Sequence, residues 1–135
     1  MTQGVIPIVP VALNTYFPPN QPRPARCYRL GQEIASAVRR WDKDARVGIL
    51  GSGGLTHFVV DEKLDRMVMD ACRNKDAEAL KSIDPKLLNS GTSEIRNWIV
   101  VAGACEHLDT DWQDYIPCYR SAAGTGCGMG FAVWK

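Results

Sequence analysis

The amino-acid sequence predicts an α/β fold with a mostly parallel sheet, a βαβ unit and flanking helices, in a single domain over residues 1–135. Two kinds of pattern lead to this prediction. Apolar, β-branched runs at Val5–Leu13 and Arg46–Leu50 are typical of strands, and the amphipathic stretch Tyr28–Trp41 between them is typical of a helix. A strand, a helix and a strand in this order form a right-handed crossover that joins parallel strands.

The composition is that of a globular protein with a core of its own. Of the 135 residues, 45% are hydrophobic and 23% are charged, which is ordinary for a soluble domain. A net charge of +1 indicates no nucleic-acid partner, and no apolar run is long enough for a membrane span. The five cysteines are irregularly spaced and odd in number, which argues against a disulfide framework. We therefore expect a reducing, cytoplasmic location.

The first predicted strand, Val5–Leu13, contains Pro7 and Pro10, which cannot donate hydrogen bonds to a neighbouring strand. We therefore expect an edge strand or a broken one. The following segment, residues 14–24, holds four prolines, which exclude a helix and favour extended backbone. A loop of this length in a compact domain commonly forms the wall or lid of a site, although a surface crossover fits the sequence equally well.

The second predicted strand, Arg46–Leu50, stops at the glycine-rich turn Gly51–Gly54, and His57 follows that turn. In open α/β sheets, ligands bind beyond the carboxyl ends of the strands. Parallel strands would direct both the proline-rich loop and this turn to the same end of the sheet. We therefore place His57 in a cleft between them. The alternative is a structural histidine in an inert network.

Three further helices are predicted downstream. Residues 61–72 carry an apolar stripe at helical spacing, Ala77–Ile83 is a short helix, and Ser90–Trp98 opens the last one. Thr92 or Ser93 is expected to cap this last helix, and Glu94 lies in its first turn. The helix dipole favours a glutamate there, and a role as a ligand or base that faces a site is the alternative.

The tail, residues 109–135, is rich in aromatic residues and glycines. We expect a flexible loop before a short strand, Phe131–Trp134. The alternating glycines do not match a phosphate-binding motif, because too few residues follow them to form a helix. A zinc site is a further hypothesis, although no C-x-x-C pair supports it; its ligands would be Cys105, His107, Cys118 and Cys127.

Three segments of the chain resemble one family of enzymes. They read Leu-Asn-Thr-Tyr-Phe-Pro-Pro-Asn-Gln-Pro (13–22), Gly-Ser-Gly-Gly-Leu-Thr-His-Phe-Val-Val-Asp-Glu (51–62) and Ser-Gly-Thr-Ser-Glu-Ile-Arg-Asn-Trp-Ile (90–99). All three, in this order, are similar to segments of the class III extradiol ring-cleaving dioxygenases, the catalytic beta subunit of protocatechuate 4,5-dioxygenase and its relatives. The resemblance covers the chain up to about Ala104.

The resemblance implies a specific chemistry. Such enzymes hold non-heme Fe(II) through two histidines and one glutamate, and they open the ring of a catechol-type diol, protocatechuate- or gallate-like, with O₂. His57 matches the family's acid–base histidine outside the metal shell, and Glu94 matches its glutamate ligand. The same segments border the predicted cleft, so the candidate substrate-binding residues are Asn14, Ser52 and Thr56.

The family's two histidine ligands lie in an N-terminal half that this chain does not contain. Only His57 and His107 are present, so if His57 is the base, one histidine remains where two are needed. The chain therefore resembles the C-terminal half of a larger α/β dioxygenase. Fe(II) would belong to the complete enzyme, and we expect this chain alone to hold none. Its expected partners are the aromatic diol, O₂, and the missing half or another subunit, in an oligomer that covers an unpaired sheet edge.

Two other functions remain open. One is a metal-free binding or assembly module that has the same fold without the chemistry. The other is a hydrolase that uses His57 with Ser52 or Thr56, although residues 50–54 lack the G-x-S-x-G pattern of such enzymes.

Overall fold

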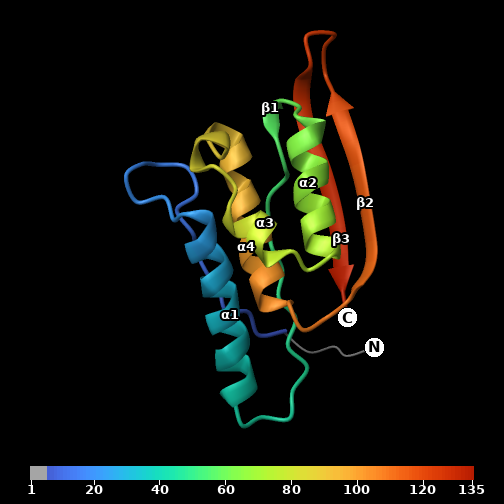
Figure 1. The fold of residues 1–135 in the computed structure, drawn as a ribbon. Coiled ribbons are helices and arrows are strands. Elements are labelled where there is room, and N and C mark those ends of the chain that lie inside the picture. Colours follow the sequence, from blue (N-terminus) through green and yellow to red (C-terminus); the bar gives the residue numbers. More distant parts are fainter. Residues whose placement is uncertain (1–5) are drawn as a thin grey trace.

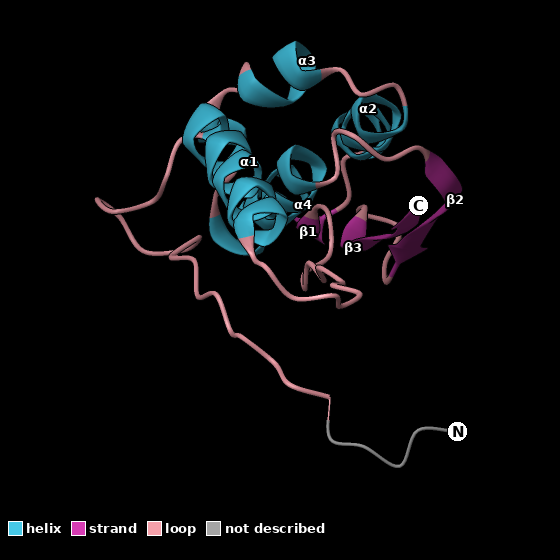
Figure 2. Ribbon diagram, turned by 90° about the horizontal axis from the view of Figure 1, so that it is seen from below, coloured by secondary structure: helices cyan, strands magenta, loops and turns pink. Residues whose placement is uncertain are grey.

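The computed structural model describes residues 6–135 as four α-helices and two short 3₁₀ helices packed on a three-stranded antiparallel sheet (Figure 1). The elements follow one another as α1 (Pro24–Arg40), β1 (His57–Val59), α2 (Glu62–Arg73), α3 (Ala77–Lys81), η1 (Pro85–Leu87), η2 (Ser90–Glu94), α4 (Ile95–Ala104), β2 (Thr110–Tyr119) and β3 (Thr125–Trp134). The strand order is β1-β3-β2, and the helices gather on one side of the sheet (Figure 2).

Helix α4 lies at the centre of the helical layer, packed against α1 (Figure 1). Eight of its ten residues are buried, and all but Arg96 of these carry apolar or no side chains. Ile95 and Ile99 are fully buried and join the core that also contains Leu55 and Val68. Any residue at the start of α4 is therefore held in a fixed position relative to this core.

The predicted helices are confirmed, with shifted ends. Helix α1 begins at Pro24 and not at Tyr28, because proline is well suited to the first helical position, where no N–H partner is required. Asp61 caps α2 by accepting a hydrogen bond from the Leu64 N–H. The predicted cap of the last helix is wrong: a 3₁₀ turn precedes α4, and no side chain caps it.

The tail contradicts the prediction of a flexible loop, whereas the predicted short strand, Phe131–Trp134, is confirmed as the end of β3. The tail forms a hairpin of two ten-residue strands, β2 and β3, in which Cys118 pairs with Cys127 and Tyr115 pairs with Gly130. One face of this hairpin contacts α2, where the Gln113 amide donates to the Met69 carbonyl oxygen. The other face points away from the helices.

The predicted parallel sheet and βαβ unit are absent from the described part of the chain, although the α/β class is confirmed. Arg46–Leu50 is extended but pairs with no strand among residues 6–135, and Leu50 is 92% exposed. Residues 6–13 are likewise extended and unpaired there, and Val5 lies outside the described residues. An apolar, β-branched run favours extended backbone, but a strand also requires a neighbour that completes its hydrogen bonds.

Within residues 6–135, no helix combines the length and the apolar character that crossing a membrane requires.

Candidate functional site around His57 and Glu94

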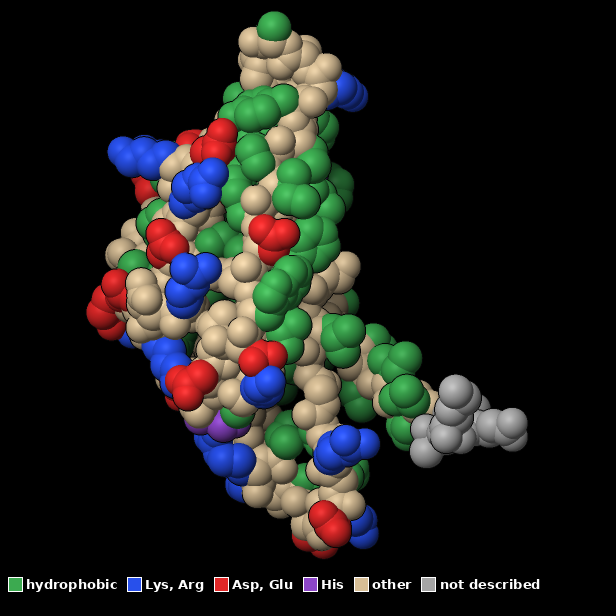
Figure 3. Space-filling model, turned by 90° about the vertical axis from the view of Figure 1, so that its right-hand side faces the viewer, with side chains coloured by type: hydrophobic (Ala, Val, Ile, Leu, Met, Phe, Trp, Pro, Cys, Tyr) green, Lys and Arg blue, Asp and Glu red, His purple; other side chains and the backbone are tan. Residues whose placement is uncertain are grey.

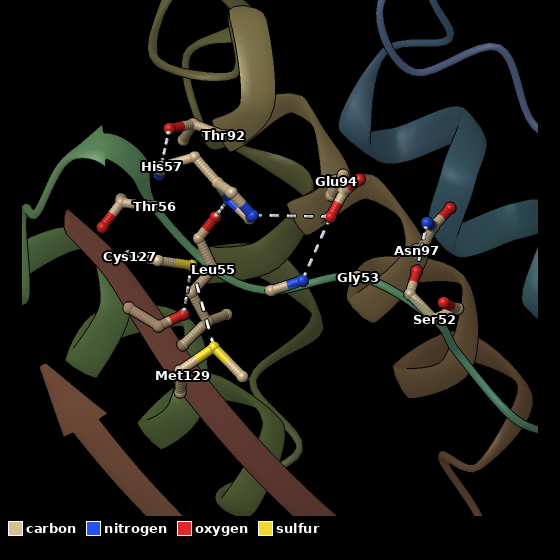
Figure 4. Close-up of polar contacts among 12 residues, drawn as sticks. Ser52, Gly53, Leu55, Thr56, His57, Thr92, Glu94, Asn97, Cys127 and Met129 are labelled. Carbon is tan, nitrogen blue, oxygen red and sulfur yellow. Dashed lines mark hydrogen bonds and ion pairs between the residues drawn. The ribbon is translucent and has the colours of Figure 1, made fainter. Parts of the chain in front are cut away.

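The structure brings His57 and Glu94 together. His57 Nε2 lies 3.8 Å from Glu94 Oε2, and both side chains are partly exposed (Figure 4). His57 opens strand β1, whereas Glu94 ends η2 immediately before α4. The sequence placed both residues at one cleft, and the structure shows that they are neighbours.

Two hydrogen bonds orient His57. Its backbone N–H donates to Thr92 Oγ1 at 3.0 Å, and its ring Nδ1 lies 2.9 Å from the carbonyl oxygen of Leu55. A carbonyl oxygen can only accept, so in the neutral ring the proton is on Nδ1. The lone pair is therefore on Nε2, the nitrogen that faces Glu94 and the partly open side of the site.

Glu94 is held more loosely than His57. Its Oε2 accepts a hydrogen bond of 3.1 Å from the Gly54 N–H, and its side chain is 42% exposed. Within the described residues, Oε1 accepts no hydrogen bond. One carboxylate oxygen is thus fixed by the protein, and the other is available to a ligand.

The glycine-rich turn lies along the start of α4 and not at the end of a strand. The Asn97 amide donates to the Ser52 carbonyl oxygen at 2.6 Å, and the Trp98 indole N–H donates to the Gly53 carbonyl oxygen at 3.0 Å. Ser52 itself is exposed and lies beyond Glu94 as seen from His57 (Figure 4). Its side chain stays a candidate for ligand contact at the edge of the site.

Two glycines enclose the His57 ring at van der Waals distance. A Cβ atom at Gly54 would lie 2.7 Å from His57 Cε1, and a Cβ atom at Gly91 would lie 2.5 Å from His57 Cβ. Both distances are shorter than real side chains allow, so any larger residue would displace the imidazole. The absence of side chains at these positions lets the backbone of both residues approach the histidine closely.

Thr56 is buried and belongs to a polar network under the site. Its hydroxyl donates to Asp65 Oδ2 at 2.8 Å and accepts from the Asp61 N–H at 3.0 Å, and its side chain is 2% exposed. The predicted contact of this side chain with a substrate is therefore not available in this structure. Thr56 instead fixes the backbone immediately before His57.

Asp65 is the centre of this network, and the sequence analysis did not find it. Its fully buried carboxylate accepts hydrogen bonds from the Thr56 N–H, the Thr56 hydroxyl and the Tyr115 hydroxyl. Burial, together with the Asp65 carboxylate, raises the pKa of Tyr115. The network joins α2 to the residue that precedes β1 and to β2, so three segments share one buried carboxylate. An aspartate within the apolar stripe of α2 was the available signal.

Arg96 is a second residue that the sequence analysis missed. The residue is 2% exposed, and its guanidinium donates to four backbone carbonyl oxygens, those of Thr15, Pro22, Leu88 and Ser93. Burial lowers the pKa of Arg96. These bonds attach the proline-rich loop to the turn that carries Glu94. An arginine directly after Ile95, in a helix with an apolar stripe, was the signal for this role.

Asn14 contributes to the shape of the proline-rich loop. Its side chain exchanges hydrogen bonds with the backbone of Phe17, a local turn on the surface. Gln21 fixes the same loop through the carbonyl oxygens of Thr15 and Tyr16. Within the described residues, no hydrogen bond joins Asn14 to His57 or Glu94.

Cys127 borders the site from the sheet and was considered only as a zinc ligand at the sequence level. It is the partner of His57 in the β1–β3 register, and its thiol lies 3.8 Å from Met129 Sδ. Burial raises the pKa of the Cys127 thiol, and Cys118, Asp65 and Glu94 raise it further. Residues 6–135 contain no group of three His, Cys, Asp or Glu side chains that could hold a metal ion, and His107 is exposed.

Comparison with known proteins adds one finding. Residues 1–129 match the family described as the catalytic LigB subunit of aromatic ring-opening dioxygenase. The match covers most of the chain and includes both His57 and Glu94.

Proposed function

The chain belongs to the family of the catalytic LigB subunit of aromatic ring-opening dioxygenases, and from this premise we propose that it is the C-terminal part of a non-heme Fe(II) extradiol dioxygenase. Its substrates are then O₂ and a catechol-type diol, protocatechuate- or gallate-like. The observation that carries the proposal is the placement of His57 Nε2, with its lone pair free, 3.8 Å from the Glu94 carboxylate.

In this proposal His57 acts as the acid–base residue. A diol hydroxyl donates a hydrogen bond to Nε2 and then transfers its proton there. The imidazolium that forms is stabilised by the Leu55 carbonyl oxygen at Nδ1 and by the negative charge of Glu94. The proton later returns from Nε2 to a product oxygen, so the ring nitrogen ends the cycle neutral. Thr92, Gly54 and Gly91 keep the ring in place throughout.

The described residues do not complete an iron site. Fe(II) in oxygenases takes two histidines and one carboxylate, with positions left open for substrate and O₂. Glu94 can supply one oxygen ligand through the free side of its carboxylate, and His57 is assigned to proton transfer. The two histidine ligands must then come from outside these residues, from another segment or another subunit. We assign no step of the reaction to iron on this chain.

The second candidate function is that of a metal-free binding or assembly module with the same fold. The incomplete ligand set within residues 6–135 favours it. The two functions differ in one measurement: whether the chain, joined to the segment or subunit that supplies two further histidines, binds one Fe(II) and consumes O₂ with a catechol.

The test compares three variants in that complete assembly. His57→Gln should retain iron but lose about a hundredfold to ten-thousandfold in kcat, the usual contribution of a positioned acid–base group. Glu94→Ala should lose iron and activity together, because one ligand is missing. The exposed His107→Gln is the control and should retain both. Loss of iron in His57→Gln would show that His57 is a ligand, and stoichiometric iron with turnover in the isolated chain would refute the assignment of ligands.

A further inference from the structure

Cys127 and His57 border the same space. They are partners in the β1–β3 ladder, so their side chains project to the same face of the sheet. A Cβ atom at Gly54 would lie 3.2 Å from Cys127 Sγ, 2.7 Å from His57 Cε1 and 3.3 Å from His57 Nε2. The thiol and the imidazole therefore meet at one point beside the Gly54 backbone, and Figure 4 shows the two side chains near each other.

Met129 lies beside this thiol, and the two sulfur atoms form one continuous surface. It lies two residues beyond Cys127 on β3, on the same face, and the two sulfur atoms are 3.8 Å apart. Both side chains are partly exposed. Sulfur atoms pack favourably on aromatic rings, so this surface is suited to one face of a planar ring.

We propose that Cys127 and Met129 form the wall on which the aromatic ring of the ligand lies, and that Cys127 captures the o-quinone form of that ligand as a covalent thioether. This inference rests on the proposed function, because the o-quinone is the two-electron oxidation product of the diol assigned to the site. It assigns Cys127 as a modification site. It also assigns Cys127 and Met129 as a wall that limits which rings can bind beside His57 and Glu94.

The capture is a simple addition and needs no other reactant. Cys127 Sγ forms a bond to a ring carbon of the quinone, and the electron pair of the attacked C=C bond moves to a carbonyl oxygen. The thiol proton passes to that oxygen. The ring carbon then loses its hydrogen as a proton to the second oxygen, which restores an aromatic diol. The ring is reduced by two electrons, the sulfur carries the new bond, and nothing leaves.

The chain contains its own control. Cys118 lies directly across the β2–β3 ladder from Cys127, on the same face, and is exposed, whereas Cys127 is only partly exposed. Cys118 is one strand farther from His57 than Cys127 is. A small reagent that reports exposure should modify Cys118 first. A ring that binds beside His57 should modify Cys127 first.

The experiment uses the full chain and two electrophiles, 4-methyl-1,2-benzoquinone and iodoacetamide. Each is added briefly at one equivalent and quenched with excess thiol, and the added mass at each cysteine is measured after proteolysis. The ratio of Cys127 to Cys118 labelling should be about tenfold higher with the quinone than with iodoacetamide, because binding places the ring next to Sγ. Cys118→Ser should leave quinone labelling of Cys127 unchanged, and Met129→Ala should lower the ratio.

Equal ratios for the two reagents would overturn the inference, as would faster quinone labelling of Cys118. Circular dichroism of each variant separates a lost site from a lost fold, and Cys118→Ser keeps the test decisive if Met129→Ala does not fold. The outcome is independent of the ring-opening assay. Selective labelling of this chain together with no ring opening by the complete assembly would leave the wall in place and refute the dioxygenase, whereas ring opening by that assembly without selective labelling would refute only this inference.

Discussion

Two regions of the chain contain the same kinds of residue and behave differently. In the packed body, which comprises α1 and residues 51–135, Leu55 and Ile99 are fully buried. In the two extended segments, residues 6–13 and 42–50, Ile8 is 82% exposed and Leu50 is 92% exposed. The difference is not apolar content. It is whether the described residues offer a partner that completes the backbone hydrogen bonds and covers the side chain.

The outer face of the hairpin belongs with the exposed regions. Trp112, Phe131 and Val133 are each about half exposed, and hydrophobic side chains gather along this face (Figure 3). Trp112 and Phe131 contact each other at 6.5 Å between ring centroids. The outer face of the sheet is therefore an exposed apolar surface. The burial that stabilises the packed body occurs on the other face, which contacts the helices.

The largest effect on the free energy of unfolding is expected from Asp65→Ala, which removes the carboxylate at the centre of the buried network. Three donors, two from Thr56 and one from Tyr115, would lose their acceptor. We expect the free energy of unfolding to fall by about 3 kcal/mol, since unsatisfied buried donors are costly. Urea unfolding measures it. The control is Asp70→Ala on the exposed face of the same helix, which should change stability by less than about 0.5 kcal/mol. Equal effects of the two variants would contradict the network.

An intermediate effect on the free energy of unfolding is expected from a rise in pH, because the buried Cys72 carries an ionisable thiol. Burial raises the pKa of this thiol from 9.0 to about 12. The folded state therefore holds the proton more tightly than the unfolded state, so this stabilisation is complete below about pH 9 and is lost as the pH rises toward 12. At about pH 10.5 the loss should be about 2 kcal/mol, because one pH unit corresponds to about 1.4 kcal/mol per proton.

The comparison is made between variants, because other groups also titrate in this range. Cys72→Ala should show a shallower fall in unfolding free energy between about pH 8.5 and 10.5 than the parent chain. Cys118→Ala, which removes an exposed thiol, should keep the parent slope. An identical slope in all three proteins would mean that the Cys72 thiol is accessible to water in the folded state.

The smallest effect on stability is expected from the extended segments. Ile8→Ser combined with Leu50→Ser should change the free energy of unfolding by less than about 0.5 kcal/mol, because both side chains are exposed. Association should change instead, since exposed apolar extended segments favour pairing with another chain. Sedimentation should show self-association of the parent chain and less of it in the double variant. The control is Arg39→Ser with Lys43→Ser; a parent chain that is monomeric at all concentrations would contradict the prediction.

The helices could be predicted from the sequence because their signals are local. The apolar period of α2 and its Asp61 cap are both visible without any knowledge of the fold. Of strand β3 only the end, Phe131–Trp134, was predicted, because the inner face of its first part carries glycines and not apolar side chains. A Cβ atom at Gly128 would lie 2.0 Å from Asp65 Oδ2, and one at Gly130 would lie 2.8 Å from Leu55 Cδ1. These glycines fit against the network and the core, so the usual alternation was missing.

The proximity of His57 and Glu94 was predicted, but from a sheet that the described residues do not form. What joins them is the Thr92 hydroxyl on the His57 N–H and the attachment of the glycine-rich turn to α4. These contacts link segments far apart in the sequence, and no local pattern encodes them. The same holds for Arg96, whose four carbonyl partners are separated along the chain.

The two glycines around His57 limit how the site can diversify. Neither Gly54 nor Gly91 has a side chain that could be exchanged for another, and the space beside each is already filled by the imidazole. A related protein that accepts a bulkier or smaller ring cannot gain that preference at these two positions without moving the histidine. Variation in substrate range is therefore directed to positions 127 and 129 on β3, where side-chain size can change while the acid–base geometry is preserved.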